Sequence, residues 1–449
     1  MQSSNTFVTS LFRSADSTPS SKSKMRSGTG NSKERNSRNR RKDIAWAKSV
    51  NHGKPPGTRT FKNVYFRQKF RGLGGSIWTM KFNKSGTYFA VGGESPVVKV
   101  FKVMDSIIRS EQRSSVDDAD EAKPFFEPNP VRVFEGHTKP VVDLDWSQAN
   151  FLLTASMDTT VRLWHSARGE CLRIFKHGDV VSSVVFHPCD NITFLTGCFN
   201  GKLQMWSMVQ SSSVCAANAE DYISSAAISN DGQSAIVGTV NGRVKFYSMR
   251  NEVTREWKLN DTTQIDVRPE RAFEVRIGSE DGVKRDLSKK VCAIVPSPSD
   301  KEILITTNDA HVRTYMKNDK SLTRLYKGHV AVNNSLRGTY SNDERFLMSP
   351  LGKVLSIWDK NEAGVILTKG RNRVEVVHAY EAITLEDERA NSKEKLTGAL
   401  FAPSSDHTDT GNYTIVTASS GGTITVLQRA NLDNEVHRPN PEEGGLQRR

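Results

Sequence analysis

The 449-residue sequence lacks several features that would define other classes of protein. No apolar run reaches the roughly 18 to 20 residues that a membrane-spanning helix needs, which argues against an integral membrane protein. The five cysteines include no Cys-x-x-Cys pair, so the sequence fits neither a zinc ribbon nor a disulfide scaffold and favours a reducing, intracellular setting. A phosphate-binding loop, a His-Glu-x-x-His motif and a Gly-x-Ser-x-Gly motif are all absent. We therefore expect no enzyme, no metal site and no cofactor.

The positive charge of the chain is concentrated at its N-terminus. Of the net charge of +13, residues 1–60 carry +10, from thirteen Lys and Arg against three Asp and Glu. Within this segment, residues 13–43 contain almost no aromatic side chains, so few rings are present on which nucleic-acid bases could stack. We expect attraction to phosphate or to an anionic lipid surface through a basic cluster of five residues: Arg35, Arg38, Arg40, Arg41 and Lys42.

Composition divides the chain into three parts. Residues 1–59 and 428–449 are polar and poor in apolar side chains, so we expect two disordered tails. Between them, residues 60–427 contain short β-branched and aromatic runs separated by Gly, Asn, Asp and Ser, which predicts an all-β domain. Within this domain, 104–130 is interpreted as a loop insertion, and 360–373 also has a loop-like composition.

The strand-like runs recur in a fixed order. The clearest unit begins at Gly136-His137, continues through the runs 141–146 and 151–156, and ends in Leu163-Trp164. Six other units repeat this order with weaker matches, which gives seven in all. Since one small sheet with two apolar faces cannot bury them alone, neighbouring units must stack.

The Gly-His pairs and the Leu-Trp or Ile-Trp endings resemble those of WD repeats. This resemblance implies a seven-bladed β-propeller over residues 60–427. The last unit supplies only three strands, and the run beginning at Thr60 has no partner of its own. Propellers of this family commonly close with an N-terminal strand, so we predict that residues 60–68 pair with 423–427.

The clearest unit, which is the second of the seven and is called blade 2, contains the four residue types of the hydrogen-bonded tetrad found in this family. The resemblance implies a chain of hydrogen bonds. In this chain Asp158 bonds to the imidazole of His137, the imidazole bonds to the hydroxyl of Ser156, and the hydroxyl bonds to the indole N–H of Trp164. Blade 3 has Asn200 and blade 6 has Gly352 in place of the aspartate. A Ser, His and Asp together also match the composition of a catalytic triad, but packing within a blade is the favoured interpretation.

The turns between the second and third strands of each blade lie on one face of a propeller. We predict a protein-docking rim there, formed by apolar and polar residues at equivalent positions together with basic residues just beyond them: Met157, Phe199, Val240, Asn308, Leu351, Lys202 and Arg243. Glu94 and Ser420 complete the equivalent positions, and Lys353 follows Leu351. Inward packing of the apolar members is the alternative.

Several short sequence segments are similar to those of one eukaryotic subfamily, the Rab-effector WD-repeat proteins of recycling endosomes. They include Ile77–Phe82, Val142–Trp146, Met157–His165, Leu304–Asp309 and Ala399–Pro403. The resemblance implies a non-catalytic scaffold or adaptor in vesicle trafficking that engages a Rab-type small GTPase. It also implies a monomeric propeller that works within complexes, in the cytoplasm and peripherally on endosomal membranes.

A second interpretation stays open. The basic tail is also typical of a nuclear or ribonucleoprotein-associated scaffold whose N-terminal arm contacts nucleic acid.

Overall fold

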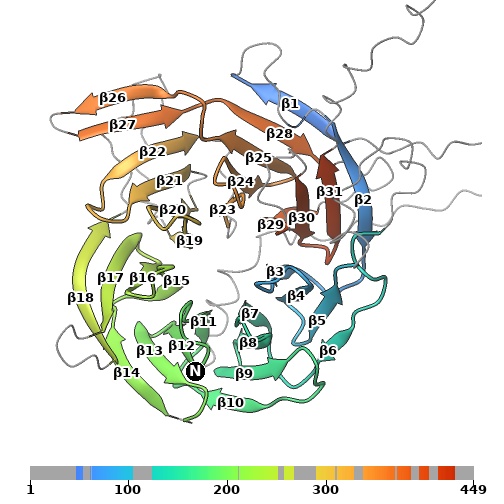
Figure 1. Ribbon diagram of the computed structural model, residues 1–449, viewed down its shortest axis with the longest axis vertical. Coiled ribbons are helices and arrows are strands. Elements are labelled where there is room, and N and C mark those ends of the chain that lie inside the picture. Colours follow the sequence, from blue (N-terminus) through green and yellow to red (C-terminus); the bar gives the residue numbers. More distant parts are fainter. Residues whose placement is uncertain are drawn as a thin grey trace, which may run out of the picture.

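The computed structural model describes residues 47–53, 61, 63–104, 124–210, 212–250, 257–266, 290–308, 311–327, 337–369, 372–385, 394–403 and 413–429. The strands of these residues form seven sheets, and no helix occurs among them. The sheets stand in a ring, each with its first strand toward a common axis (Figure 1). The expected seven-bladed propeller is confirmed.

Blades 1 to 4 are antiparallel sheets of four consecutive strands. Blade 1 comprises β3 (Ile77–Phe82), β4 (Tyr88–Gly93), β5 (Val98–Lys102) and β6 (Arg132–Phe134). Blade 2 comprises β7 (Val141–Trp146), β8 (Phe151–Ser156), β9 (Thr160–His165) and β10 (Arg173–Lys176). Blade 3 comprises β11 (Val181–Phe186), β12 (Thr193–Cys198), β13 (Lys202–Ser207) and β14 (Ser213–Asn218). Blade 4 comprises β15 (Ile223–Ile228), β16 (Ser234–Thr239), β17 (Arg243–Arg250) and β18 (Trp257–Asp266).

Blade 7 closes the ring with a strand from the other end of the chain. Its strands are β29 (Leu396–Phe401), β30 (Thr414–Ser419), β31 (Ile424–Arg429) and the N-terminal β2 (Val64–Phe70). The pairing of β2 with β31 runs antiparallel from Val64 opposite Arg429 to Phe70 opposite Ile424. The predicted closure is confirmed, with both strands ending two residues later than expected.

Blade 5 is widened by an inserted hairpin. Its own strands are β19 (Val291–Pro296), β20 (Glu302–Thr307), β21 (His311–Met316) and β22 (Leu322–Lys327). The hairpin of β26 (Val365–Lys369) and β27 (Asn372–Val377) adds to β22, with β27 parallel to it. The loop-like interpretation of 360–373 is therefore wrong, because β22 leaves an open edge that the hairpin pairs with.

Blade 6 has five strands, one of them from the expected disordered tail. Its order is β1 (Lys48–His52), β28 (Tyr380–Thr384), β25 (Val354–Asp359), β24 (Phe346–Leu351) and the two-residue β23 (Thr339–Tyr340).

The expectation of disorder through residue 59 is wrong for residues 47–53. Strand β1 pairs antiparallel with β28, from Lys48 opposite Thr384 to His52 opposite Tyr380, where the two rings stack 4.6 Å apart. The edge of β28 offers backbone groups whose hydrogen bonds even a polar five-residue segment can satisfy. Residues 1–46, with the basic cluster, and residues 430–449 lie outside the described residues.

The apolar core lies between the blades. One cluster joins Val98 and Val100 of blade 1 to Leu144 and Trp146 of blade 2. Another joins Leu203 and Met205 of blade 3 to residues of blade 4. Each sheet therefore buries its faces against its neighbours, as the stacking argument requires.

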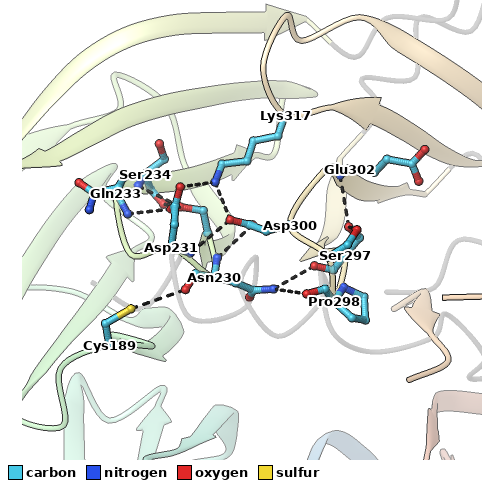
Figure 2. Close-up of polar contacts among 12 residues, drawn as sticks. Cys189, Asn230, Asp231, Gln233, Ser234, Ser297, Pro298, Asp300, Glu302 and Lys317 are labelled. Carbon is cyan, nitrogen blue, oxygen red and sulfur yellow. Dashed lines mark hydrogen bonds and ion pairs between the residues drawn. The ribbon is translucent and has the colours of Figure 1, made fainter. Parts of the chain in front are cut away.

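The face opposite the rim is held by polar contacts between turns of adjacent blades (Figure 2). The Lys317 Nζ lies 2.6 Å from a carboxylate oxygen of Asp231 in blade 4 and 2.6 Å from one of Asp300 in blade 5. The side-chain amide of Asn230 donates to the Ser297 carbonyl, and the Cys189 thiol of blade 3 contacts the Asn230 carbonyl. Burial disfavours the charge on Lys317, but the two carboxylates outweigh it and raise its pKa.

Candidate protein-docking rim

A repeated backbone hydrogen bond defines the rim. The residue that follows the second strand donates its N–H to the carbonyl of the residue just before the first strand, as Met157 does to Pro140 at 3.0 Å and Phe199 to Val180 at 2.9 Å. The same bond occurs in four other blades: Glu94 to Ser76, Val240 to Tyr222, Asn308 to Lys290 and Ser420 to Lys395. These six positions are therefore geometrically equivalent and lie at one end of the blades, whereas the predicted position in blade 6, Leu351, lies within β24.

The apolar rim residues pack together rather than standing exposed. Met157 and Phe199 are only 5% and 4% exposed. They belong to one cluster, here called the apolar rim cluster, which is formed by Trp78, Val142, Met157, Val180, Phe199 and Val240. Of the two interpretations left open, an exposed docking patch and inward packing, Met157 and Phe199 follow inward packing, because closing the ring brings the apolar rim side chains of blades 1 to 4 within reach of one another.

Tyr222 is the exposed aromatic residue beside this cluster. Its side chain is 52% exposed, and its ring lies 5.7 Å from that of buried Phe199. Lys202 and Arg243, the predicted basic residues, are exposed on the turns of blades 3 and 4. Sequence reasoning missed Tyr222, although an aromatic residue directly before a first strand was a usable signal.

The remaining rim positions are polar or undescribed. Asn308 is half-buried, and Lys353 is exposed. Glu94 accepts a hydrogen bond from the Ser76 N–H, and the Ser420 hydroxyl accepts one from the Lys395 N–H. Leu351 lies within β24, and its side chain is outside the described residues. The apolar part of the rim, as described, is thus confined to blades 1 to 4.

The tetrad of blade 2 forms through Thr154 rather than Ser156. His137 Nδ1 lies 2.8 Å from Asp158 Oδ2, and its Nε2 lies 2.8 Å from the hydroxyl oxygen of Thr154. The Trp164 indole N–H donates to that same oxygen at 2.9 Å. The assignment of Ser156 is wrong, because its hydroxyl donates to the Lys139 carbonyl instead. Ser156, His137 and Asp158 therefore do not form a hydrogen-bonded triad.

Asp158 is held in its ionised form. Burial would raise its pKa, but hydrogen bonds from His137, Thr160 and the Thr138 N–H outweigh it and hold the pKa well below its usual range. A charged carboxylate fixes the imidazole, so the network lets Trp164 be buried with its N–H satisfied.

Blade 3 contains a shortened version of the same network. His177 Nε2 lies 3.0 Å from the Thr196 hydroxyl, and the Trp206 indole donates to that hydroxyl at 3.1 Å. In place of an aspartate, His177 Nδ1 contacts the Phe175 carbonyl at 3.2 Å. Burial lowers the pKa of His177 to about 4. In blade 6, His329 lies outside the described residues, and the Trp358 indole donates to the Lys327 carbonyl at 3.4 Å.

In the part of the chain that the structure describes, no three His, Cys, Asp or Glu side chains gather as metal ligands would. Among the same residues, no helix has the length and apolar character needed to cross a bilayer.

Comparisons with known proteins agree with the architecture. The family model "WD domain, G-beta repeat" matches residues 128–165 and 169–207. Each match covers the fourth strand of one blade and the first three strands of the next, from β6 to β9 and from β10 to β13. The chain is 31% identical over 372 residues to WD repeat-containing protein 44 of Xenopus laevis, covering 73% of this chain and 37% of that protein.

Two further relatives match over different lengths. An uncharacterized WD repeat-containing protein of Schizosaccharomyces pombe is 28% identical over 337 residues, which cover 73% of this chain and 54% of that protein. A component of chromatin assembly factor 1 from Mus musculus is 28% identical over 126 residues, which cover 27% of this chain and 22% of that protein. The chain thus spans about a third to a half of the first two relatives' lengths.

Proposed function

Because this chain belongs to the WD-repeat β-propeller proteins, we propose that it is a non-catalytic scaffold that binds protein partners through its rim. The observation that carries the proposal is the exposed Tyr222, whose ring lies against Phe199 of the apolar rim cluster, together with exposed Lys202 and Arg243 on the turns of blades 3 and 4. An exposed aromatic ring backed by a rigid apolar support, with cations nearby, is typical of binding hot spots.

We place this scaffold in vesicle trafficking, in the cytoplasm and peripherally on endosomal membranes, with a Rab-type small GTPase or its complex as partner. Support comes from the short sequence segments that resemble the Rab-effector subfamily and from the similarity over 372 residues to WD repeat-containing protein 44. The polar residues of the remaining rim would then surround the contact as its solvated edge.

Binding of purified Rab-type GTPases tests this proposal. The full chain is immobilised, and a panel of these GTPases is applied in GTP-analogue and GDP forms. We expect at least one to bind in the GTP-analogue form, and Tyr222→Ala to weaken that binding about tenfold or more. Val209→Ala shortens another exposed side chain, in the turn after β13 of blade 3. It is the matched control and should bind normally. Equal binding by Tyr222→Ala and the wild type would place the contact elsewhere.

The second candidate is a nuclear or ribonucleoprotein-associated scaffold. The basic cluster and the similarity to a chromatin assembly factor component favour it. Deleting residues 1–46 removes the cluster and leaves β1 in place. Only this candidate predicts RNA binding whose affinity falls steeply with salt and is lost on deletion.

A further inference from the structure

Two carboxylates lie side by side on the innermost strand of blade 2. Asp143 and Asp145 are two residues apart on β7, so their side chains leave the same side of the strand. Asp145 Oδ1 contacts the Lys81 Nζ of blade 1 at 3.1 Å, and its Oδ2 accepts a hydrogen bond from the Phe186 N–H of blade 3 at 2.7 Å. The cation that neutralises Asp145 therefore comes from the adjacent blade.

Asp143 bridges the same two neighbouring blades through uncharged hydrogen-bond donors. Its Oδ1 accepts a hydrogen bond from the Thr79 hydroxyl of blade 1. Its Oδ2 accepts hydrogen bonds from the Ser183 hydroxyl at 3.0 Å and the Val184 N–H at 3.1 Å, both in blade 3. These uncharged donors are built into the inner strands and hold the carboxylate in place.

The cation beside Asp143 comes from the blade 6 side of the ring. Arg337 Nη1 lies 3.0 Å from Asp143 Oδ1, although the two residues are 194 positions apart. Burial alone would raise the pKa of Asp143, but the charges of Arg337 and Lys81 and the Val184 N–H outweigh it and lower the pKa. The carboxylate is therefore ionised, and its side chain is only 5% exposed.

Arg337 is less firmly built in than its partner. Its side chain is 31% exposed, whereas the side chain of Asp143, which its guanidinium contacts, is 5% exposed. The next residue, Gly338, is anchored by its N–H to the Thr306 hydroxyl, and β23 then begins with only two residues. Innermost strands of the other blades have six residues. Arg337 thus precedes the shortest strand of the ring, whereas Asp143 lies within a six-residue strand.

This carboxylate lies next to the docking rim. Val142, the neighbour of Asp143 in the chain, belongs to the apolar rim cluster, and β7 starts at the rim end of blade 2. The first strands of the blades surround the middle of the ring (Figure 1). A partner seated on the rim over blades 1 to 4 would therefore be placed close to Asp143.

We propose that Asp143, with Thr79, Ser183 and the Val184 N–H, forms a guanidinium-binding site that Arg337 occupies in cis and that an arginine of a protein partner takes over. A buried carboxylate with fixed geometry favours guanidinium over ammonium, because guanidinium is planar and more weakly hydrated. The inference deepens the proposed function and rests on it, since it names the side chain by which a rim partner is recognised.

Chemical rescue tests the site. In the purified full-length chain, Arg337→Ala leaves Asp143 without its arginine. We expect low-millimolar methylguanidinium to raise the Tm of this variant saturably by a few degrees, because a ligand bound only to the folded state stabilises it. Methylammonium at the same concentration should not. The wild type, whose site is filled, should show no saturable rise with either compound.

Two controls keep the result specific to Asp143. Arg345→Ala removes another arginine, one paired with Asp359 at 3.4 Å outside this site, and should gain nothing from methylguanidinium. Asp143→Asn combined with Arg337→Ala should also gain nothing. If that double variant does not fold, Thr79→Val and Ser183→Ala in the Arg337→Ala background replace it, and each should weaken methylguanidinium binding severalfold.

The inference is overturned if Arg337→Ala shows no saturable rise, if methylammonium matches methylguanidinium, or if the wild type responds equally. Such a result would leave the binding experiment with Tyr222→Ala untouched, because that experiment involves no ligand at Asp143. Conversely, methylguanidinium rescue together with unimpaired partner binding by Tyr222→Ala would keep this site and remove the proposed docking surface.

Discussion

Blades 2 and 6 bury the same residue in two different ways. Trp164 and Trp358 are each the penultimate residue of a third strand, and both are fully buried. The indole of Trp164 donates to the Thr154 hydroxyl of its own blade, whereas that of Trp358 donates to the Lys327 carbonyl of blade 5 at 3.4 Å. Blade 2 thus satisfies its tryptophan internally, and blade 6 depends on a neighbour.

The rest of blade 6 follows the same pattern. Ser349 occupies the position of Thr154, and its buried hydroxyl has no hydrogen-bond partner among the described residues. Strand β1 covers the outer edge of blade 6. The hairpin of β26 and β27, which lies between β25 and β28 in the sequence, binds blade 5, where Arg324 Nε lies 2.7 Å from Glu375 of β27. The comparison teaches that a blade whose described residues form no closed polar network can be held by strands that come from elsewhere in the chain.

Removing the central hydroxyl of each blade tests this contrast most strongly. Thr154→Val keeps the shape of the side chain but leaves His137 Nε2 and the Trp164 N–H buried without their partner. We expect a loss of about 2–4 kcal/mol in the free energy of unfolding, measured by urea denaturation of the full chain. Ser349→Ala, at the equivalent position of blade 6, removes no hydrogen bond to any residue that the structure describes and should change stability by less than about 1 kcal/mol.

Ser156→Ala is the matched control within blade 2. It removes the hydrogen bond to the Lys139 carbonyl and the one that the hydroxyl accepts from the Asp158 N–H, so a loss of about 1–2 kcal/mol is expected. Equal losses for Thr154→Val and Ser349→Ala would show that the network does not distinguish the two blades.

The tetrad also shows how far sequence reasoning reaches. Counting the repeat units predicted seven blades, and the resemblance to WD repeats, together with one unpaired run, implied the closing strand. It did not separate Thr154 from Ser156, which are two residues apart and therefore leave β8 on the same side. Only the depth of each hydroxyl along the strand decides which one reaches His137 and Trp164.

Contacts that depend on the closed ring were not predictable from single units. Met157 and Phe199 come from turns of different blades. Their side chains join one apolar cluster, and become buried, only after the blades have stacked. Strand β1 has a polar sequence, Lys-Ser-Val-Asn-His, that shows no strand pattern of its own. It is ordered by the free edge of β28, which lies more than 300 residues away in the chain.

Truncation tests whether β1 supports blade 6. Deleting residues 1–53 removes the five residue pairs between β1 and β28. At a few tenths of a kcal/mol or more for each pair, the free energy of unfolding should fall by about 1–3 kcal/mol. Deleting residues 1–46 is the control, because it leaves every described residue in place. Denaturation curves that coincide for the two truncations would mean that β1 adds no support.

Blade 3 lies between the two extremes, and its pH dependence tests the role of the missing aspartate. Because the pKa of His177 is about 4 in the folded protein and about 6.5 in an unfolded chain, the unfolded state binds the proton more readily between these values. Stability is therefore fully present above about pH 6.5 and is lost as the pH falls toward 4. One pH unit below 6.5, the loss should be about 1 kcal/mol.

Two variants sharpen this last comparison. His177→Gln removes the titrating group, so its stability should depend less on pH across this window than that of the wild type. Asn200→Asp places a carboxylate at the position that Asp158 occupies in blade 2, and a nearby negative charge favours the protonated imidazole. It should raise the pKa of His177 and likewise flatten the profile, in urea denaturation series between about pH 7 and 4. If the wild type and His177→Gln lose stability in parallel, the acid sensitivity arises outside blade 3, and the shortened network is as tolerant of acid as the complete one.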